Sequence, residues 1–552
     1  MATITLFKAK KIITMNPRQP VADYVAVRDG IILGTGSLDS LAGWGDYEID
    51  NQFADKVILP GFIEGHCHSW EGAAWEDTYV GFLDRTSPTR EVHPGLKSIG
   101  SVVEKLKKAN HTLTDPTTPV KGWGLDPIFF ERRVTCADLD QISTTRPVVV
   151  IHQSGHIINV NSYVLDKAGI DGNTDVDGLV TDGHGELTGE LMGIALYQTA
   201  LKAIGMNSIL DMGENAERSL WWFANSAQIA GVTTVTDLAS ELSPEMVTVQ
   251  QSLAALDSYP IRVVPAFMGQ MVPSNEGVEK MLNLKKQSTP KLQLGLVKLI
   301  VDGSIQGFTA RLKTPGYYNG APNGLWYVDP TELPSIIEAY HSAGLQIHIH
   351  TNGDEATEEA LDAIEQVLKV HPDSDARFTL QHCQMAHDAH FKRMARLGVC
   401  ANLFANHLYY WGDQHYETTM GPERAARMDA ANSAGRLGVN YSIHSDAPVT
   451  HLSPLFTAWC GVNRRTYSGR ILGEPECISV QEALHAVTLG AAFTLKLDSE
   501  LGSIECGKRA DFTILEDDPL TIDPMKLKDI TVWGTVLDGR VFPVSEIGRN
   551  MN

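Results

Sequence analysis

Two histidines separated by one residue, His66 and His68, follow the apolar run Val57-Ile58-Leu59. Because successive side chains of a strand point to opposite faces, both imidazoles should lie on one side at the end of a buried strand. Two neutral imidazoles on one face can share a divalent cation, and imidazole is a common zinc ligand. In isolation such a pair is more often hydrogen-bonded within a core or rim, so the rest of the chain must decide.

A lysine that burial could activate lies in a later apolar run. Lys298 is flanked by aliphatic residues within 294–301. Burial should lower the pKa of its amine towards the free base, which can react with CO2 to give a carbamate that bridges two cations. A salt bridge, for example to Asp302, is an equally good interpretation from the residues alone.

Three further candidates follow other strand-like runs. His350 ends a second His-X-His pattern that begins with His348, and His382 ends the next run. Asp446 follows the last run and precedes Ala447-Pro448, a position that also suits a helix N-cap. Imidazole nitrogen and carboxylate oxygen together are the donor set of a catalytic metal site, where Asp446 could accept a proton from water.

Alternating strand-like and helix-like patterns must position these residues. Most of the strand-like runs are preceded by an amphipathic helix such as 332–342 or 356–369. The runs are 57–62, 232–236, 261–267, 294–301, 345–350, 377–382, 399–402 and 439–444. This alternation predicts an α/β fold of the (β/α)8 or TIM barrel class. Catalytic groups of such barrels lie at the C-terminal strand ends, where the candidate residues occur.

The segments outside this repeat indicate additional structure. Residues of about 76–215 separate the first two strands and are too many for a loop, so we expect an insertion with its own structure. Residues 1–58 and 501–552 consist of short strands with glycine-marked turns. We therefore expect both ends to form one small β-sandwich domain beside a barrel at 59–500.

Composition and charge exclude several classes of protein. The net charge of -22 argues against nucleic-acid or anionic-membrane partners, which clustered Lys and Arg would bind. Seven scattered cysteines without CxxC spacing suit reduced thiols. No stretch approaches 18 uninterrupted apolar residues, so the sequence predicts a cytoplasmic enzyme or binding protein with no membrane partner.

Taken together, the motifs resemble the amidohydrolase superfamily, and within it the YtcJ-like branch that includes N-substituted formamide deformylases. The matching segments span nearly the whole chain: residues 60–68, Gly155-His156, Asn161-Ser162, residues 187–191, Val297-Lys298, residues 302–304, residues 350–354, His382, residues 421–425, residues 445–448 and residues 502–511.

The resemblance implies a metal-ligand set. His66, His68 and Asp446 would hold the more buried cation, a carboxylated Lys298 would bridge, and His350 and His382 would hold a second cation. One or two divalent metals per chain are therefore expected, with zinc first and manganese, iron or cobalt as alternatives. The resemblance also suggests a homodimer.

We therefore expect an enzyme, a metal-dependent hydrolase that cleaves a non-peptide C–N bond of a small amide-like substrate, N-acyl or N-formyl, through metal-activated hydroxide. Trp70, Trp123 and Trp326 favour an aromatic substrate, although packing of the insertion onto the barrel is the alternative explanation for them. His156 and Asn161 match a family motif in the insertion, which could act as a lid, and are candidates for substrate binding.

Two alternatives remain open. The same site could serve decarboxylation, isomerisation or deamination, which product analysis would separate. The chain could instead be a regulatory binding protein on a barrel that has lost its catalytic activity, because fold does not determine function. A site without catalytic activity has no physical need for all six candidate ligands, which disfavours this second alternative.

Overall fold

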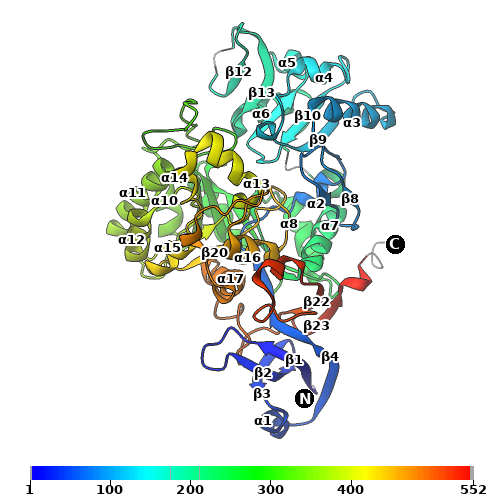
Figure 1. Ribbon diagram of the computed structural model, residues 1–552, viewed down its shortest axis with the longest axis vertical. Coiled ribbons are helices and arrows are strands. Elements are labelled where there is room, and N and C mark those ends of the chain that lie inside the picture. Colours follow the sequence, from blue (N-terminus) through cyan, green and yellow to red (C-terminus); the bar gives the residue numbers. More distant parts are fainter. Residues whose placement is uncertain (1–2, 175, 210–211, 548–552) are drawn as a thin grey trace.

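The computed structural model describes residues 3–174, 176–209 and 212–547. Within them, eight parallel strands form one curled sheet in the middle of the molecule (Figure 1). In sheet order they are β5 (Phe62–Glu64), β14 (Val232–Ser240), β15 (Arg262–Met268), β16 (Leu296–Ile300), β17 (Gln346–Thr351), β18 (Thr379–His382), β19 (Cys400–Leu403) and β20 (Tyr441–Ile443). A parallel bridge between Cys67 and Ala447 joins the segments after the first and last strands. The predicted α/β fold with a barrel-like sheet of eight parallel strands is confirmed.

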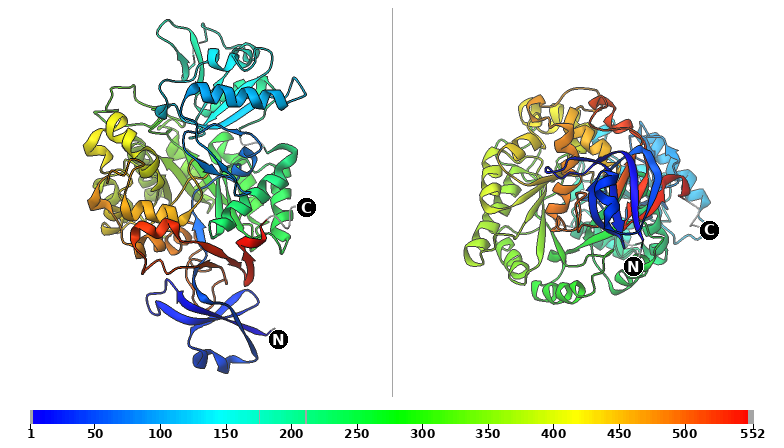
Figure 2. Two further views of the ribbon diagram at one scale, coloured as in Figure 1. Left: turned by 45° about the vertical axis from the view of Figure 1, so that its right-hand side comes forward. Right: turned by 90° about the horizontal axis from the view of Figure 1, so that it is seen from below.

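Helices surround this sheet, as the view from below shows (Figure 2). They include α7 (Ala216–Ile229), α8 (Pro244–Ala255), α9 (Ser274–Lys285), α10 (Leu333–Ser342), α11 (Asp354–Val370), α12 (Asp388–Leu397), α15 (Ala431–Arg436), α17 (Val480–Ala486) and α18 (Leu489–Thr494). In α11, the buried residues Ala356, Ala360 and Ile364 recur at four-residue spacing, which places them on one face towards β17. Further helices are α2 (Glu71–Ala74), α13 (Asn406–Gln414), α14 (Gly421–Ala425) and α16 (Pro454–Asn463).

The first barrel strand differs from the predicted one. The run Val57-Ile58-Leu59 belongs to β4 (Tyr47–Pro60), which pairs with β1 and β21 outside the barrel. The barrel strand is the shorter β5, which begins at Phe62. Both segments are buried and apolar, so the sequence pattern alone reads them as one strand. His66 and His68 nevertheless follow a buried strand, as expected.

The segment between β5 and β14 has a sheet of its own at one end of the molecule (Figure 1). Its strands, in sheet order, are β12 (Leu179–Thr181), β13 (Leu187–Met192), β11 (Ile157–Val160), β10 (Val148–His152), β9 (Val120–Leu125) and β6 (Thr78–Tyr79). A two-stranded ribbon of β7 (Arg85–Thr86) and β8 (Val92–His93) and the helices α3 (Ile99–Thr112), α4 (Cys136–Asp140), α5 (Ser162–Ala168) and α6 (Ile194–Ala203) accompany it. A separate cluster of buried side chains, including Val103, Leu106, Val120 and Val148, gives this insertion a core.

Both ends of the chain meet in one sheet at the opposite end (Figure 1). Its order is β23 (Arg540–Pro543), β22 (Val532–Leu537), β21 (Phe512–Leu515), β4, β1 (Ile4–Ile13), β2 (Val21–Arg28) and β3 (Ile31–Gly36), and the short α1 (Leu38–Leu41) follows. Asp29 and Gly30 have φ of 52° and 75°, the left-handed backbone that a two-residue hairpin turn requires. The strands form a single seven-stranded sheet, and the sandwich arrangement stays a prediction.

A buried arginine connects the barrel to this terminal sheet. Arg262, at the start of β15, is 1% exposed and donates to the carboxylates of Asp511 and Asp538 and to the carbonyl of Pro290. The Arg262→Leu substitution leaves Asp511 buried without its cation, so we expect the free energy of unfolding to fall by about 3–5 kcal/mol. Urea denaturation followed by circular dichroism measures this loss. Substituting Asp511→Leu as well should recover part of it, and an unchanged single variant would contradict the prediction.

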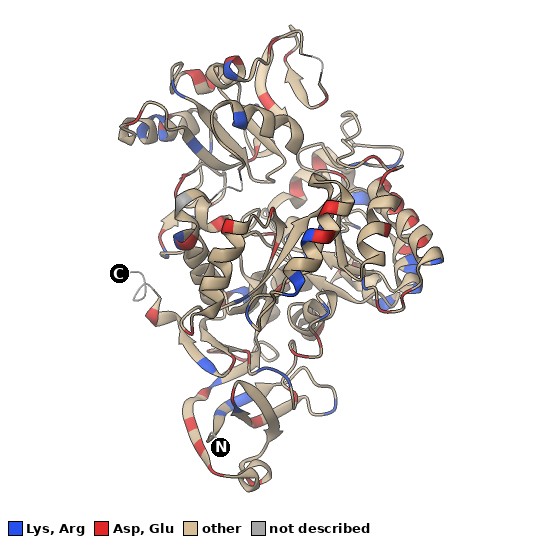
Figure 3. Ribbon diagram, turned by 180° about the vertical axis from the view of Figure 1, so that it is seen from behind, with Lys and Arg blue, Asp and Glu red and all other residues tan. Residues whose placement is uncertain are grey.

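The outer surface is charged and mixed in sign. Figure 3 shows Lys and Arg interspersed with Asp and Glu along the outer helices. On α12, for example, Arg393 pairs with Glu358, Asp362 and Glu365 of α11 at 2.7–2.8 Å. Such exposed pairs contribute little to stability individually. Among the described residues, no helix combines the length and the apolar character that crossing a membrane would require.

Candidate metal centre

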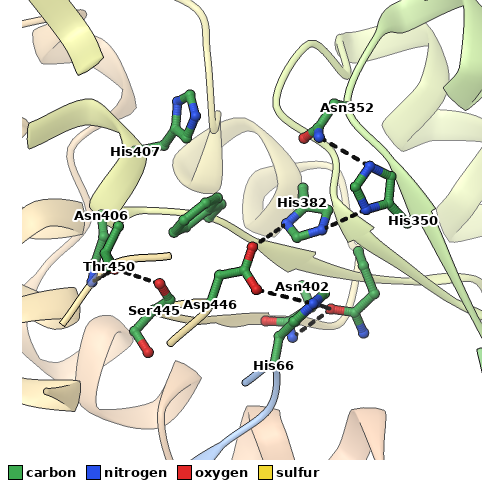
Figure 4. A network of polar contacts seen from close by, with 12 residues as sticks. His66, His350, Asn352, His382, Asn402, Asn406, His407, Ser445, Asp446 and Thr450 are labelled. Atoms are coloured by element: carbon green, nitrogen blue, oxygen red, sulfur yellow. Dashed lines mark hydrogen bonds and ion pairs between the residues drawn. The ribbon is translucent and has the colours of Figure 1, made fainter. Parts of the chain in front are cut away.

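The strand ends bring the six predicted metal ligands to one cavity of about 90 Å³. Its walls include His66 and His68 after β5, Lys298 on β16, His350 on β17, His382 at the end of β18 and Asp446 after β20. Parallel strands place their C-terminal ends at one edge of the sheet, which explains why residues so far apart in sequence meet. Figure 4 shows four of them in one polar network.

The carboxylate of Asp446 lies at the centre of this group. Its Oδ1 is 3.3 Å from Nε2 of His66 and 3.1 Å from Nε2 of His68, and its Oδ2 is 3.9 Å from Nδ1 of His382. The ligand atoms of His66, His68 and Asp446 all lie within 4.8 Å of one another, as a shared cation requires. His350 extends the group, because its Nδ1 is 3.0 Å from Nε2 of His382.

Two of these residues have unusual backbone conformations. His382 has φ of 71° and Asp446 has φ of 56°, in the left-handed region that residues other than glycine rarely adopt. Such strain costs about 1–3 kcal/mol per residue and is found preferentially at functional sites. The surrounding contacts therefore hold both side chains against a local preference for other conformations.

The protonation states suit cation binding. Burial, with help from nearby cationic groups, lowers the pKa of His66, His350 and His382 well below the usual histidine value, so their imidazoles are neutral. Burial also lowers the pKa of Lys298 to about 7, although the nearby Asp446 opposes the shift. A large fraction of Lys298 is therefore the free amine at neutral pH.

The salt-bridge interpretation of Lys298 is wrong for Asp302. The carboxylate of Asp302 accepts hydrogen bonds from the backbone amides of Arg311, Asn352 and Gly353 at 2.9–3.0 Å. Nζ of Lys298 is buried and has no hydrogen-bond partner among the described residues. Asp302 thus organises the loop after β17, whereas the amine of Lys298 remains available inside the cavity.

Unpaired polar atoms provide the test of whether a metal fits. Nζ of Lys298, Nδ1 of His68 and Nδ1 of His382 are all buried without a hydrogen-bond partner in the described structure. Each such atom costs about 1–3 kcal/mol when nothing compensates it. A divalent cation bound by nitrogen and carboxylate ligands would remove much of this cost, so the residues present fit a metal.

A chain of hydrogen bonds determines which nitrogen His66 offers to the cavity. His348 donates from Nε2 to the carbonyl of Thr494 at 3.0 Å and accepts at Nδ1 from the side-chain amide of Gln381 at 2.8 Å. The oxygen of Gln381 then accepts from Nδ1 of His66 at 2.7 Å. Nδ1 of His66 therefore carries the proton, and the lone pair of Nε2 faces Asp446. This arrangement explains His348, which we interpret as a supporting residue.

We expect the Gln381→Leu substitution to weaken metal binding by about 10–100-fold, because it removes the group that orients the His66 ring. Competition with a chromogenic chelator measures this affinity. Gln346→Leu is the matched control, since Gln346 bonds the carbonyls of Arg377 and Thr494 and has no contact with His66. Equal affinities in the two variants would contradict the role of Gln381.

A buried carboxyl group connects the two segments that carry His66 and Asp446. Glu64 accepts hydrogen bonds from the amide of Ser445 at 3.1 Å, from its hydroxyl at 2.9 Å and from the amide of His66 at 3.4 Å. Burial raises the pKa of Glu64 to about 8. Through these bonds, Glu64 fixes the first and last strand ends relative to each other.

The predicted substrate-binding residues fall into two groups. Trp70 and His156 line the cavity, and the His156 ring lies 5.2 Å from that of His350. Asn161 is instead the N-cap of α5, and its side-chain amide donates to the carbonyls of Ser143 and Arg146. Capping of a helix start thus accounts for Asn161 without a ligand.

The other two tryptophans also lie outside the cavity. Trp123 packs against Trp75 and Tyr79 inside the insertion, with ring centroids 5.0 and 4.9 Å apart. Trp326 lies against the guanidinium of Arg311, 4.7 Å from the ring centroid. Neither tryptophan is among the residues that line the cavity, and a role of either in substrate binding stays a prediction.

Sequence reasoning missed several residues of the cavity wall. Leu238 and Met268 line it from the ends of β14 and β15, and Tyr197 lines it from α6 of the insertion. Beyond them, a larger chamber of about 720 Å³ shares Trp70 and Met268 with the inner cavity. Leu238 and Met268 could have been predicted, because functional residues of such barrels lie at the C-terminal ends of the strands. The position of Tyr197 depends on how the insertion packs against the barrel, which the sequence pattern does not show.

Comparisons with known proteins agree with this architecture. A family model described as "Amidohydrolase family" matches residues 54–543. The putative amidohydrolase YtcJ of Bacillus subtilis (strain 168) is 28% identical over 545 residues, which are 96% of this chain and 97% of that protein. The N-substituted formamide deformylase of Arthrobacter pascens is 25% identical over 539 residues, 95% of this chain and 96% of that protein.

A solved structure has a fold similar to that of this chain. The crystal structure of an uncharacterized metal-dependent hydrolase from Pyrococcus horikoshii OT3 has a TM-score of 0.71 and 20% sequence identity. The alignment covers 95% of this chain and 99% of that one. The barrel, the insertion and the terminal sheet thus occur together in a solved protein of the same overall fold.

Proposed function

The chain belongs to the amidohydrolase family and is a hydrolase of carbon–nitrogen bonds other than peptide bonds, and we propose that it is a metal-dependent enzyme. We propose a small organic amide as its substrate. The observation that carries the proposal is the convergence of four histidines, Asp446 and the unpaired amine of Lys298 on one cavity. A site that had lost its chemistry would have no reason to keep buried polar atoms unpaired.

We propose that His66, His68 and Asp446 hold one divalent cation, and that His350 and His382 hold a second, with a carboxylated Lys298 between them. The free amine of Lys298 attacks CO2 and loses a proton, which yields the bridging carbamate. Zinc is the metal we propose first, since neutral imidazole and carboxylate are its usual ligands. Bound in this cavity, a divalent cation lowers the pKa of water and polarises a substrate carbonyl.

The chain's own residues account for proton transfer and orientation. We propose that the carboxylate of Asp446, which lines the cavity, accepts a proton from the attacking water and delivers it to the leaving nitrogen. His156 is neutral, because burial lowers its pKa to about 4, and its Nδ1 has no partner among the described residues. It can therefore orient the substrate amide through a hydrogen bond. Trp70 and Tyr197 shield this region from bulk water.

The substrate class follows from the walls of the cavity. Leu238, Met268 and Trp70 present apolar surface next to the polar strand ends, which suits an apolar or aryl substituent on the amide. The likeness to the N-substituted formamide deformylase favours an N-formyl or N-acyl bond. We therefore propose N-formyl or N-acyl amines with an aromatic portion as substrates.

A panel of N-formyl and N-acetyl arylalkylamines tests this proposal. The expected result is release of the free amine and of formate or acetate, detected by liquid chromatography, and loss of that activity on chelation. Products of decarboxylation, isomerisation or deamination would replace the proposed reaction with one of those classes. Absence of turnover on the whole panel by metal-loaded protein would count against the substrate class.

A further inference from the structure

A fifth histidine lies directly beside the proposed ligands. His444 directly follows β20 and precedes Asp446 by two residues, in the loop at the C-terminal end of the strand. It is 0% exposed, and neither of its ring nitrogens has a hydrogen-bond partner in the described structure. The ligand set proposed above does not use it.

The surroundings of His444 consist of rings and of other unpaired nitrogens. Its ring stacks on His66, with centroids 4.7 Å apart and an interplanar angle of 18°, and on Phe404 at 4.8 Å and 19°. The His382 ring lies 5.0 Å away at 61°. Ligand atoms of His66, His382 and His444 all lie within 4.8 Å of one another, as they do in the triad of His66, His68 and Asp446.

Both nitrogens of His444 need a partner that the protein does not supply. A neutral imidazole has one N–H donor and one acceptor, and each costs about 1–3 kcal/mol when buried unpaired. The rings of His66 and His382, with centroids 4.7 and 5.0 Å from that of His444, are imidazoles as well. Lone pairs that converge in this way suit a cation better than a water molecule, which needs donors as well as acceptors.

We propose that His444 is an additional imidazole ligand of the deeper cation, which His66, His382 and His444 hold next to Asp446. The inference rests on the metal dependence proposed above; it adds His444 to the ligands and assigns His382 to the deeper cation instead of the second one. His66 belongs to both triads, so a cation held by His66, His382 and His444 would lie close to Asp446. The alternative is that His444 only packs between Phe404 and His66.

The His444→Phe substitution separates the two roles, because a phenyl ring preserves the stacking and removes both nitrogens. Phe404→Leu is the matched control, since it alters the packing on His444 and leaves the nitrogens. The readouts are the affinity for Co²⁺, from chelator competition, and the visible absorption spectrum of the Co²⁺-loaded protein. We expect His444→Phe to lower the affinity at least about tenfold and to shift the spectrum, with the control close to wild type.

Each result of the Co²⁺ measurements either supports or overturns the role of His444 as a ligand. If wild type binds Co²⁺ and His444→Phe binds it equally well with an unchanged spectrum, His444 is a packing residue and the proposed function stands. If metal-free wild type binds no Co²⁺, the proposed function and this inference both fail. If His444→Phe does not fold, as judged by circular dichroism, His444→Gln is measured by the same two readouts, and wild-type affinity and spectrum in that variant would overturn the proposal.

Discussion

The Asp446→Asn variant is expected to lose turnover by about 10²–10⁴-fold, the range of general acid–base catalysis, while remaining folded. The carboxylate lies 3.1–3.3 Å from Nε2 of both His66 and His68, so it is placed to act as a cation ligand and as the proton acceptor. Asparagine has nearly the same shape but cannot take a proton from water. Measuring kcat/KM on the best substrate of the amine panel, with the metal content of the same sample, tests this expectation.

Asp354→Asn is the matched control for this substitution. Asp354 also follows a barrel strand, but it belongs to the first turn of α11, and its carboxylate accepts a hydrogen bond from the amide of Lys313. We expect its kcat/KM to stay within about threefold of wild type, since only contacts with the Lys313 amide and with Arg424 change. An Asp446→Asn protein that keeps its metal and full turnover would remove Asp446 from the proposed mechanism.

The ligand positions could be predicted because two simple rules apply to them. Side chains alternate along a strand, and parallel strands of a barrel end at one edge, so His66, His68 and His382 had to meet if the strands were identified correctly. His444 also lies at the end of a barrel strand, directly after β20 and two residues before Asp446. The position of His444 could be read from the sequence, but its significance becomes clear only because both ring nitrogens are unpaired in the described part of the folded protein.

Other features depend on tertiary packing that no local pattern contains. The apolar run 57–59 extends the terminal sheet rather than the barrel, and both locations bury the same kind of residue. Trp123 lies on β9 of the insertion and Trp326 in a loop; their ring partners are Trp75 in the insertion and Arg311. For Asn161, the position before a helix was itself the better predictor, since asparagine is among the preferred N-cap residues.

A second large effect is expected at Lys298. The Lys298→Met substitution keeps the length and apolar stem of the side chain and removes the amine, which is 1% exposed and unpaired. Folding stability should therefore stay the same or rise, because an uncompensated buried polar atom is lost. Without the carbamate, however, the two cations have no common ligand. We expect metal content to fall from about two equivalents per chain to one or fewer, with a loss of turnover of at least about 10²-fold, as expected when a metal-supported step is removed.

Metal analysis by plasma mass spectrometry, on protein purified without chelators or affinity-metal columns, distinguishes the outcomes for Lys298. Two equivalents in wild type and fewer in Lys298→Met support a bridging carbamate, because a side chain that binds no cation cannot change the stoichiometry. One equivalent in both proteins, with turnover lost only in the variant, makes Lys298 an amine that contacts substrate in a mononuclear enzyme. If reconstituted wild type holds no metal, the unpaired amine and imidazoles must bind an organic ligand directly, and a binding protein becomes the better explanation of the cavity.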